Sequence, residues 1–230
     1  MTDARTTSYY KYIEYKNRYR PYKNQRINYI LTNFDSWFFK KFPLKNKKIL
    51  DFGCSINSRM YERFIRENGN DSGYFGFDIE ESVISWLKEK NYFLDTSAIT
   101  KKELFDYIFL VDIYEHLELY ERIEMLKAAH KLLKFGGLVV VAYPYMKNLN
   151  FFINGISDPT HKLTDFEGEV ANFIEYGGFE QEKVNLFLGG WTTPAISLLK
   201  NLMAIFRNLL CLFPPFHVAV ITAEKQQNHT

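Results

Sequence analysis

The predicted fold is decided by the stretch Lys48-Ile49-Leu50-Asp51-Phe52-Gly53-Cys54. Its first five residues form a short apolar run that ends at a glycine, which is typical of a buried strand followed by a tight turn. In residues 58–68, Met60, Phe64 and Ile65 share one helical face, and Gly69 is a typical residue after a helix end. Strand, turn and helix in this order indicate the first unit of an α/β sheet.

The same alternation continues along the 230-residue chain. We expect further strands at 74–78, 92–94, 105–111, 138–143, 184–188 and 217–223, and helices at 81–90, 119–133 and 167–176. Nearly continuous apolar strands imply a parallel sheet covered by helices on both faces. The sequence therefore predicts a doubly wound α/β domain.

Acidic side chains follow four of these strands, where ligands bind in open α/β sheets. They are Asp51, Asp78, Asp95 and Asp112. Asp78 lies 25 positions after Gly53, a spacing that fits recognition of two ribose hydroxyls by a carboxylate. Each acidic residue alone could be a helix cap, but the ordered set points to a ligand site.

The composition is that of a folded protein, because 47% of the residues are hydrophobic and 24% are charged. Cys54 and Cys211 are too few for a disulfide framework and lie in no metal-ligand spacing, so we predict a reducing compartment and no metal site. The first residues lack the apolar core of a signal peptide, and a membrane-spanning helix is disfavoured. We therefore predict a cytoplasmic protein.

The charge is concentrated at the N-terminus. Residues 1–48 hold 12 Lys and Arg against 3 Asp and Glu, and tyrosines alternate with arginines there. We interpret residues 1–46 as a basic, aromatic, helical arm. Its basic face is either solvated or binds an anionic partner such as nucleic acid or lipid headgroups.

The chain resembles the class I S-adenosylmethionine-dependent methyltransferases over roughly residues 47–225. The motifs that carry this resemblance are residues 49–54, 76–78, 105–108 with 115–117, 132–137, and 158–161. The resemblance implies a Rossmann-like, doubly wound, seven-stranded mixed sheet with an antiparallel last strand. It leaves an apolar helical insertion at 190–216 and a polar tail at 226–230.

The resemblance also implies S-adenosylmethionine as cofactor and assigns its binding residues. These are Asp51, Gly53 and Ser55 at the methionine end, Asp78 at the ribose, Ile79 and Asp95 at the adenine, and Asp112 in the same cleft. Ser55 and Asn57 stand where the family usually has one or two glycines. Serine is small and asparagine tolerates the left-handed conformation, so we expect binding to be retained.

A methyl sulfonium is already activated, so the enzyme must mainly align the acceptor with it. A hydroxyl acceptor also needs a base, and His116 and His161 are the candidates. The alternatives are that His161 is bound by a neighbouring backbone group and that His116 only orients its loop. Aromatic residues, 17% of the chain, recur in the segments expected around the acceptor, at Tyr143, Tyr145, Phe151, Phe152, Trp191 and Phe206.

The sequence pattern of residues 195–213 predicts one amphipathic helix with a wide apolar face. We expect it to be a lid on the acceptor, a contact with a membrane surface or a second copy of the chain, or additional core. A membrane contact would make the cytoplasmic protein peripheral to the membrane.

The predicted function is methyl transfer to a small, or a glycan- or lipid-linked, acceptor by His-assisted O-methylation. One alternative is an RNA methyltransferase that uses the basic arm, although the sequence lacks the Asp/Asn-Pro-Pro-Tyr and Pro-Cys motifs of base methylation, so nucleic acid is disfavoured. The other is a degenerate, non-catalytic partner subunit.

Overall fold

The structure is a computed structural model that describes residues 26–30, 32–56, 58–92, 104–144, 166–189 and 218–227. The predicted features outside these residues include the insertion at 190–216, the candidate base His161, the adenine contact Asp95, and the first 25 residues of the basic arm.

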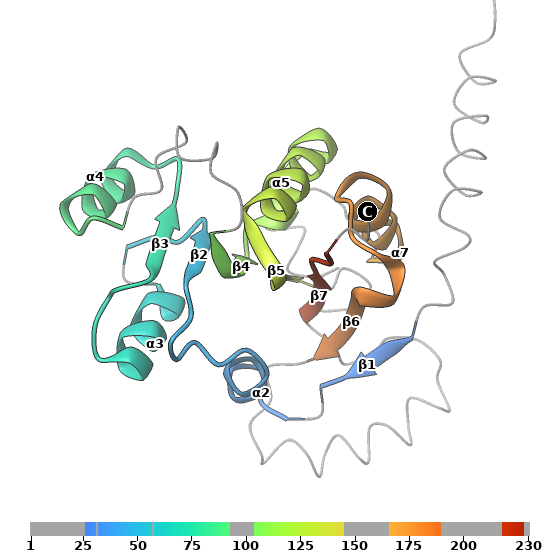
Figure 1. The fold of residues 1–230 in the computed structure, drawn as a ribbon, viewed down its shortest axis with the longest axis horizontal. Helices are drawn as coiled ribbons and strands as arrows, with labels where there is room; N and C mark the ends of the chain where they lie inside the picture. The colour runs from blue at the N-terminus through green and yellow to red at the C-terminus, as the bar shows by residue number, and fades with distance from the viewer. Residues whose placement is uncertain are drawn as a thin grey trace, which may run out of the picture.

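A seven-stranded mixed sheet forms the centre of the protein (Figure 1). In spatial order its strands are β1 (Ile27–Tyr29), β6 (Val184–Gly189), β7 (Val218–Glu224), β5 (Leu133–Pro144), β4 (Phe105–Val111), β2 (Ile49–Phe52) and β3 (Tyr74–Phe77). Neighbouring strands are parallel, except that β7 is antiparallel to both β5 and β6. The carboxyl ends of β2, β3 and β4 therefore meet at one edge of the sheet.

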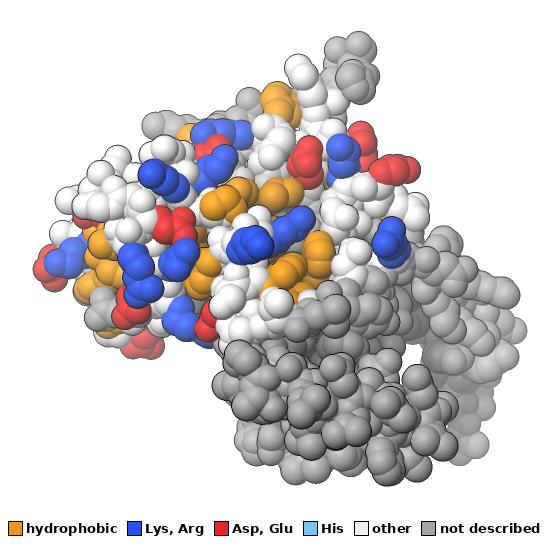
Figure 2. Space-filling view, turned by 90° about the horizontal axis from the view of Figure 1, so that it is seen from below, with side chains coloured by type: hydrophobic (Ala, Val, Ile, Leu, Met, Phe, Trp, Pro, Cys, Tyr) orange, Lys and Arg blue, Asp and Glu red, His pale blue; other side chains and the backbone are white. Residues whose placement is uncertain are grey.

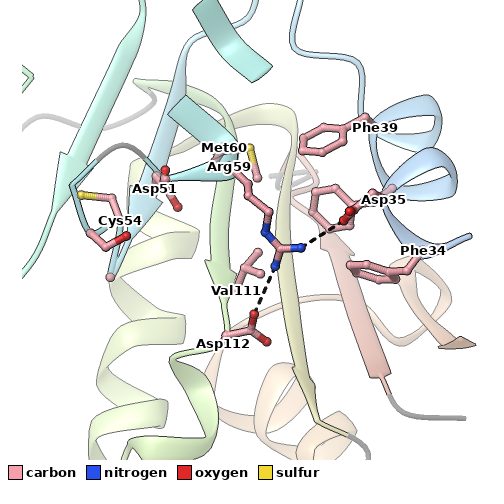
Figure 3. Close-up of a pocket in the computed structure, with 13 residues that line it drawn as sticks. Phe34, Asp35, Phe39, Asp51, Cys54, Arg59, Met60, Val111 and Asp112 are labelled. Carbon is pink, nitrogen blue, oxygen red and sulfur yellow. Dashed lines mark hydrogen bonds and ion pairs between the residues drawn. The ribbon is translucent and has the colours of Figure 1, made fainter. Parts of the chain in front are cut away.

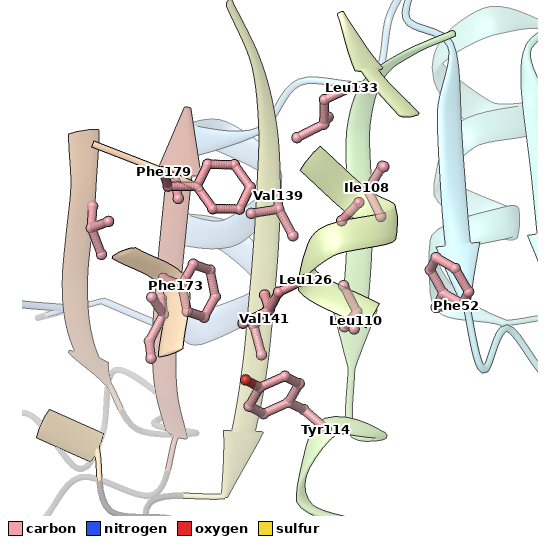
Figure 4. Packing of buried hydrophobic residues seen from close by; sticks show 14 of the residues in the cluster. Phe52, Ile108, Leu110, Tyr114, Leu126, Leu133, Val139, Val141, Phe173 and Phe179 are labelled. Carbon is pink, nitrogen blue, oxygen red and sulfur yellow. The ribbon is translucent and has the colours of Figure 1, made fainter. Parts of the chain in front are cut away.

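Helices cover both faces of the sheet (Figure 1). One face carries α5 (Leu119–Leu132), α7 (Phe166–Ala171) and the π-helix η5 (Asn172–Tyr176), and the other carries α2 (Phe34–Lys41), α3 (Arg59–Asn68) and α4 (Glu81–Glu89). Two short 3₁₀ turns, η3 (Tyr114–His116) and η6 (Gln181–Lys183), precede α5 and β6. Figure 4 shows the core on the α5 side, where Leu126, Val141 and Phe173 are fully buried. The predicted doubly wound α/β class is confirmed.

Six of the seven predicted strands correspond to strands of this sheet. β1 was not predicted, and it adds a parallel edge strand beside β6. The predicted strand at 92–94 lies outside the described residues beyond Tyr92, whose carbonyl accepts a hydrogen bond from the Gly76 N–H at 2.9 Å.

Helix α2 is held to the sheet by aromatic side chains. Phe34, Phe38 and Phe42 recur every four residues, so they lie on one helical face, and all three are buried. The Phe38 ring packs against Phe109 of β4 at 5.7 Å between centroids. Residues 26–44, which we included in the basic arm, thus supply a strand and a helix to the same core as the rest of the domain.

Within the described ranges, no helix is long and apolar enough to cross a membrane. The same part of the chain contains no group of three His, Cys, Asp or Glu side chains that could hold a metal ion.

Candidate cofactor-binding site

The turn after β2 crosses the end of β3. The backbone N–H of Gly53 donates to the Phe77 carbonyl at 2.8 Å, and the Cys54 N–H donates to the same oxygen at 3.4 Å. Gly53 has φ of +67°, and a Cβ added there would lie 2.5 Å from Cδ1 of Ile113. The position therefore requires glycine. Ser55, where the family usually has glycine, also adopts a positive φ, of 46°.

Asp51 is the buried acid of the site, with 4% of its surface exposed. Its Oδ2 accepts hydrogen bonds from the Tyr74 hydroxyl at 2.9 Å and from the Ser58 hydroxyl at 3.0 Å. Burial disfavours the charged form and raises the pKa of Asp51 from 3.8 to about 6, although both hydrogen bonds oppose this shift. The negative charge of Asp78 adds to the increase.

The raised pKa of Asp51 makes protein stability depend on pH. Between about pH 4 and pH 6, the folded protein keeps a proton on Asp51 that the unfolded chain has lost, so the unfolding free energy falls as the pH rises. For this shift the total fall is roughly 3 kcal/mol. We expect Asp51→Asn to abolish this fall. Between pH 4 and pH 8, the unfolding free energy of the variant, measured in urea, should therefore rise by about 3 kcal/mol relative to that of the wild type. Parallel stability curves for the two proteins would contradict this expectation.

Asp78 ties the ends of β2 and β3 together. Its Oδ1 accepts the backbone N–H groups of Ile79 at 2.8 Å and Glu80 at 2.9 Å, and its Oδ2 accepts the Ser55 N–H at 3.3 Å. The Ile79 side chain beside it is 89% exposed. An exposed apolar side chain next to a fixed carboxylate is suited to bind a nucleoside. The apolar side chain can contact the flat base, and the carboxylate can accept hydrogen bonds from the hydroxyls of the attached sugar.

A cavity of about 470 Å³ opens where β2, α3, α2 and the end of β4 meet (Figure 3). It is lined by Asp51, Gly53, Cys54, Ser55, Ser58, Arg59, Met60, Val111 and Asp112, and by Phe34, Asp35, Phe38 and Phe39 of α2. The structure thus brings together four of the predicted residues, Asp51, Gly53, Ser55 and Asp112. Asp78 adjoins this lining by accepting the Ser55 N–H, and Ile79 is the next residue in the chain.

An arginine that we did not predict extends into this cavity between two acids (Figure 3). Arg59 places Nη1 3.3 Å from Oδ1 of Asp35 and Nη2 3.5 Å from Oδ2 of Asp112. All three side chains are about half exposed. Asp112 has a positive φ of 54°, an uncommon conformation for a residue with a side chain and one that clusters at functional sites.

The candidate bases are not among the described residues that line the cavity. His116 lies in η3, and its backbone N–H donates to the Ile113 carbonyl at 3.0 Å. His161 is outside the described residues. Of the aromatic residues predicted around the acceptor, Tyr143 is described, and it is buried with its ring 5.9 Å from that of Tyr114. Among the described lining residues, the aromatic ones come from α2.

The residues that sequence reasoning missed come mainly from α2 and from the first turn of α3. A signal for α2 was present, because Phe34, Phe38 and Phe42 have the spacing of a buried helical face. The Lys and Arg residues around these phenylalanines favour a basic arm instead. Arg59 had no sequence signal, because its two acidic partners are 24 and 53 positions away.

The sheet order, the glycine turn after β2 and the acidic strand ends define a Rossmann-like domain, a fold that binds ligands at the carboxyl ends of its strands. Residues 15–187 match the family described as a methyltransferase domain. The chain therefore belongs to this family. The predicted class I methyltransferase identity is confirmed, together with S-adenosylmethionine as the cofactor of this class.

Solved structures with a similar fold include three methyltransferases. An S-adenosylmethionine-dependent methyltransferase from Archaeoglobus fulgidus is 20% identical, with a TM-score of 0.58 over 84% of this chain and 100% of that chain. A Thermotoga maritima methyltransferase is 16% identical, with a TM-score of 0.55 over 94% and 95%. Phosphoethanolamine N-methyltransferase 2 from Haemonchus contortus is 17% identical, with a TM-score of 0.52 over 84% and 52%. At these identities the likeness concerns the fold alone. No curated protein is significantly similar in sequence.

Proposed function

We propose that this chain binds S-adenosylmethionine in the cavity at the carboxyl edge of β2 and β4 and transfers its methyl group. The bound cofactor supplies an activated methyl sulfonium. Asp78 accepts the ribose hydroxyls, Ile79 contacts the adenine, and Asp51 and the Gly53 turn face the methionine end. The observation that carries this proposal is the fixed carboxylate of Asp78 beside the exposed Ile79, with Asp78 hydrogen-bonded to the Ser55 N–H of the cavity lining.

The acceptor that we propose is a small molecule, or a glycan- or lipid-linked one, methylated at oxygen. A hydroxyl acceptor loses its proton during transfer, and His161 or His116 is the base in this scheme. The position of His116 in the 3₁₀ turn that follows β4 supports its role at this edge of the sheet. The apolar segment at 195–213 contacts the acceptor, a membrane surface or a second copy of the chain.

Titration calorimetry with S-adenosylhomocysteine tests the proposed cofactor site. We expect the wild type to bind this product and Asp78→Asn to bind it at least about tenfold more weakly, because a hydrogen bond to a charged group contributes about 1.5–3 kcal/mol. Asp106→Asn is the matched control, because Asp106 pairs with Lys134 at the opposite end of β4, and its affinity should equal that of the wild type. A wild type without measurable affinity would favour the non-catalytic partner subunit instead.

A further inference from the structure

The cavity holds charged side chains of both signs close together. Arg59 is its one cationic side chain among the described lining residues, and the acids are Asp35, Asp51 and Asp112. A ligand group that carries one positive and one negative charge on the same carbon would complement this arrangement. The free amino-acid end of the proposed cofactor is such a group, because it bears an ammonium and a carboxylate.

We propose that Arg59 binds the carboxylate of the cofactor's methionine group, that Asp112 binds its ammonium, and that Asp35 of α2 positions the Arg59 guanidinium. This inference rests on the proposed function and adds residues that determine which adenosyl compounds bind. It makes α2, in the N-terminal segment, part of the cofactor site.

The geometry around Arg59 suits this role. Its contacts with Asp35 and Asp112, at 3.3 and 3.5 Å, are longer than the roughly 2.8 Å of a tight charge-assisted hydrogen bond. A guanidinium has five N–H donors in a planar fork, so it can bind a carboxylate along one edge while another edge stays on Asp35. The Arg59 side chain is 53% exposed and projects into the cavity, so a ligand can reach it (Figure 3).

The place of Arg59 in the chain adds to its positive potential. It is the first residue of the ten-residue helix α3, which directly follows the turn after β2. The N-terminal end of a helix favours negative charge, and the Arg59 charge adds to this effect. Asp35 lies in the first turn of α2, where the Asn33 side chain caps the helix by accepting the Ser36 N–H at 3.1 Å. Asp35 therefore has a defined backbone position from which to hold the guanidinium.

The competing explanation is that Arg59 only bridges α2 and α3. The face of the molecule that carries both helices is seen in Figure 2, where Lys and Arg side chains gather with hydrophobic ones between them. α3 also presents Arg63 and Arg66 beside a second hollow of about 480 Å³, which shares Asp35, Phe39 and Arg59 with the first. A purely bridging arginine would not distinguish ligands by their amino-acid group.

Calorimetry with two ligands separates these explanations. S-adenosylhomocysteine carries the amino-acid group, whereas 5′-methylthioadenosine has the same adenosine and thioether without it. We expect Arg59→Gln to weaken S-adenosylhomocysteine binding by about 10- to 100-fold and to change methylthioadenosine binding less than about twofold. Arg59→Lys should lie between, because it keeps the charge but loses the fork. Asp35→Asn should also weaken S-adenosylhomocysteine binding relative to methylthioadenosine binding, but by a smaller factor than Arg59→Gln.

Arg63→Gln is the matched control. Arg63 lies one turn further along α3, pairs with Glu67 at 2.5 Å and stacks over Phe39 at 5.1 Å, but does not line the cofactor cavity. Both affinities of this variant should equal those of the wild type. An equal loss of both ligands in Arg59→Gln, or no loss of either, would overturn the inference. A wild type that binds neither ligand would overturn the proposed function itself, and this inference with it.

Discussion

Replacing Glu169 by alanine is expected to lower the unfolding free energy by about 3–5 kcal/mol, because it leaves a buried charge without its partner. Oε1 of Glu169 accepts a hydrogen bond from Nη1 of Arg122 at 2.5 Å, and both side chains are at most 5% exposed. Oε2 accepts the Tyr114 hydroxyl at 2.8 Å and the Asn172 amide at 3.0 Å. The variant would bury the Arg122 guanidinium without a counter-charge.

Urea unfolding of Glu169→Ala at neutral pH measures this loss. Glu124→Ala is the control on the neighbouring helix, because Glu124 pairs with Lys127 at 2.7 Å with half or more of each side chain exposed. Exposed pairs contribute only about 0–1 kcal/mol, so the control should stay close to the wild type. If Glu169→Ala lost no more than the control, the buried network would not stabilise the fold.

The same network positions the loop after β4. Nε of Arg122 donates to the Leu117 carbonyl at 2.9 Å, and Tyr114 is the first residue of η3 (Figure 4). Glu169 on α7 and Arg122 on α5 therefore hold both ends of the turn that contains His116. We expect the loop to lose its defined position when this network is removed. Any role of His116 at the acceptor therefore depends on side chains of α5 and α7, which cover the face of the sheet opposite to α2 and α3.

Features that depend on neighbours in the sequence could be predicted. The strand that ends at Phe52 and the helix that ends at Asn68 were correct to within one residue, because an apolar run, a Ser58 cap and Gly69 with φ of +73° are all local signals. The acidic residues that follow successive strands are also a signal that can be read from neighbouring positions in the sequence. The structure places two of these residues, Asp51 and Asp112, in the lining of one cavity.

Features that depend on distant partners could not be predicted. Arg122 faces the core although arginine usually faces water, and Glu169, 47 positions away, supplies the counter-charge that its burial requires. Arg59 likewise takes its meaning from two acids on other elements. β1 has only three residues, too few for a strand pattern, and it forms because β6 offers an edge to pair with. Contacts between residues that are distant in the sequence form only once the chain has folded, so no single segment predicts the cavity walls that they build.

Replacing Gly53 by alanine is expected to cost about 2–4 kcal/mol of unfolding free energy and to weaken S-adenosylhomocysteine binding at least about tenfold. A residue with a side chain at φ of +67° costs about 1–2 kcal/mol. The new Cβ would also lie 2.5 Å from Cδ1 of Ile113 and 3.2 Å from its Cβ, so Ile113 must move. Ile113 directly follows Asp112, and its displacement would shift the opposite wall of the cavity.

Gly69→Ala separates the steric contact from the backbone cost. Gly69 has φ of +73°, nearly that of Gly53, but an added Cβ would meet nothing within 4 Å. This variant should therefore lose about 1–2 kcal/mol and bind S-adenosylhomocysteine like the wild type. The difference between the two variants measures the contact with Ile113. Equal losses of stability, with unchanged affinity in both, would show that the turn after β2 needs glycine only for its backbone conformation, and that the two walls of the cavity are not coupled through Ile113.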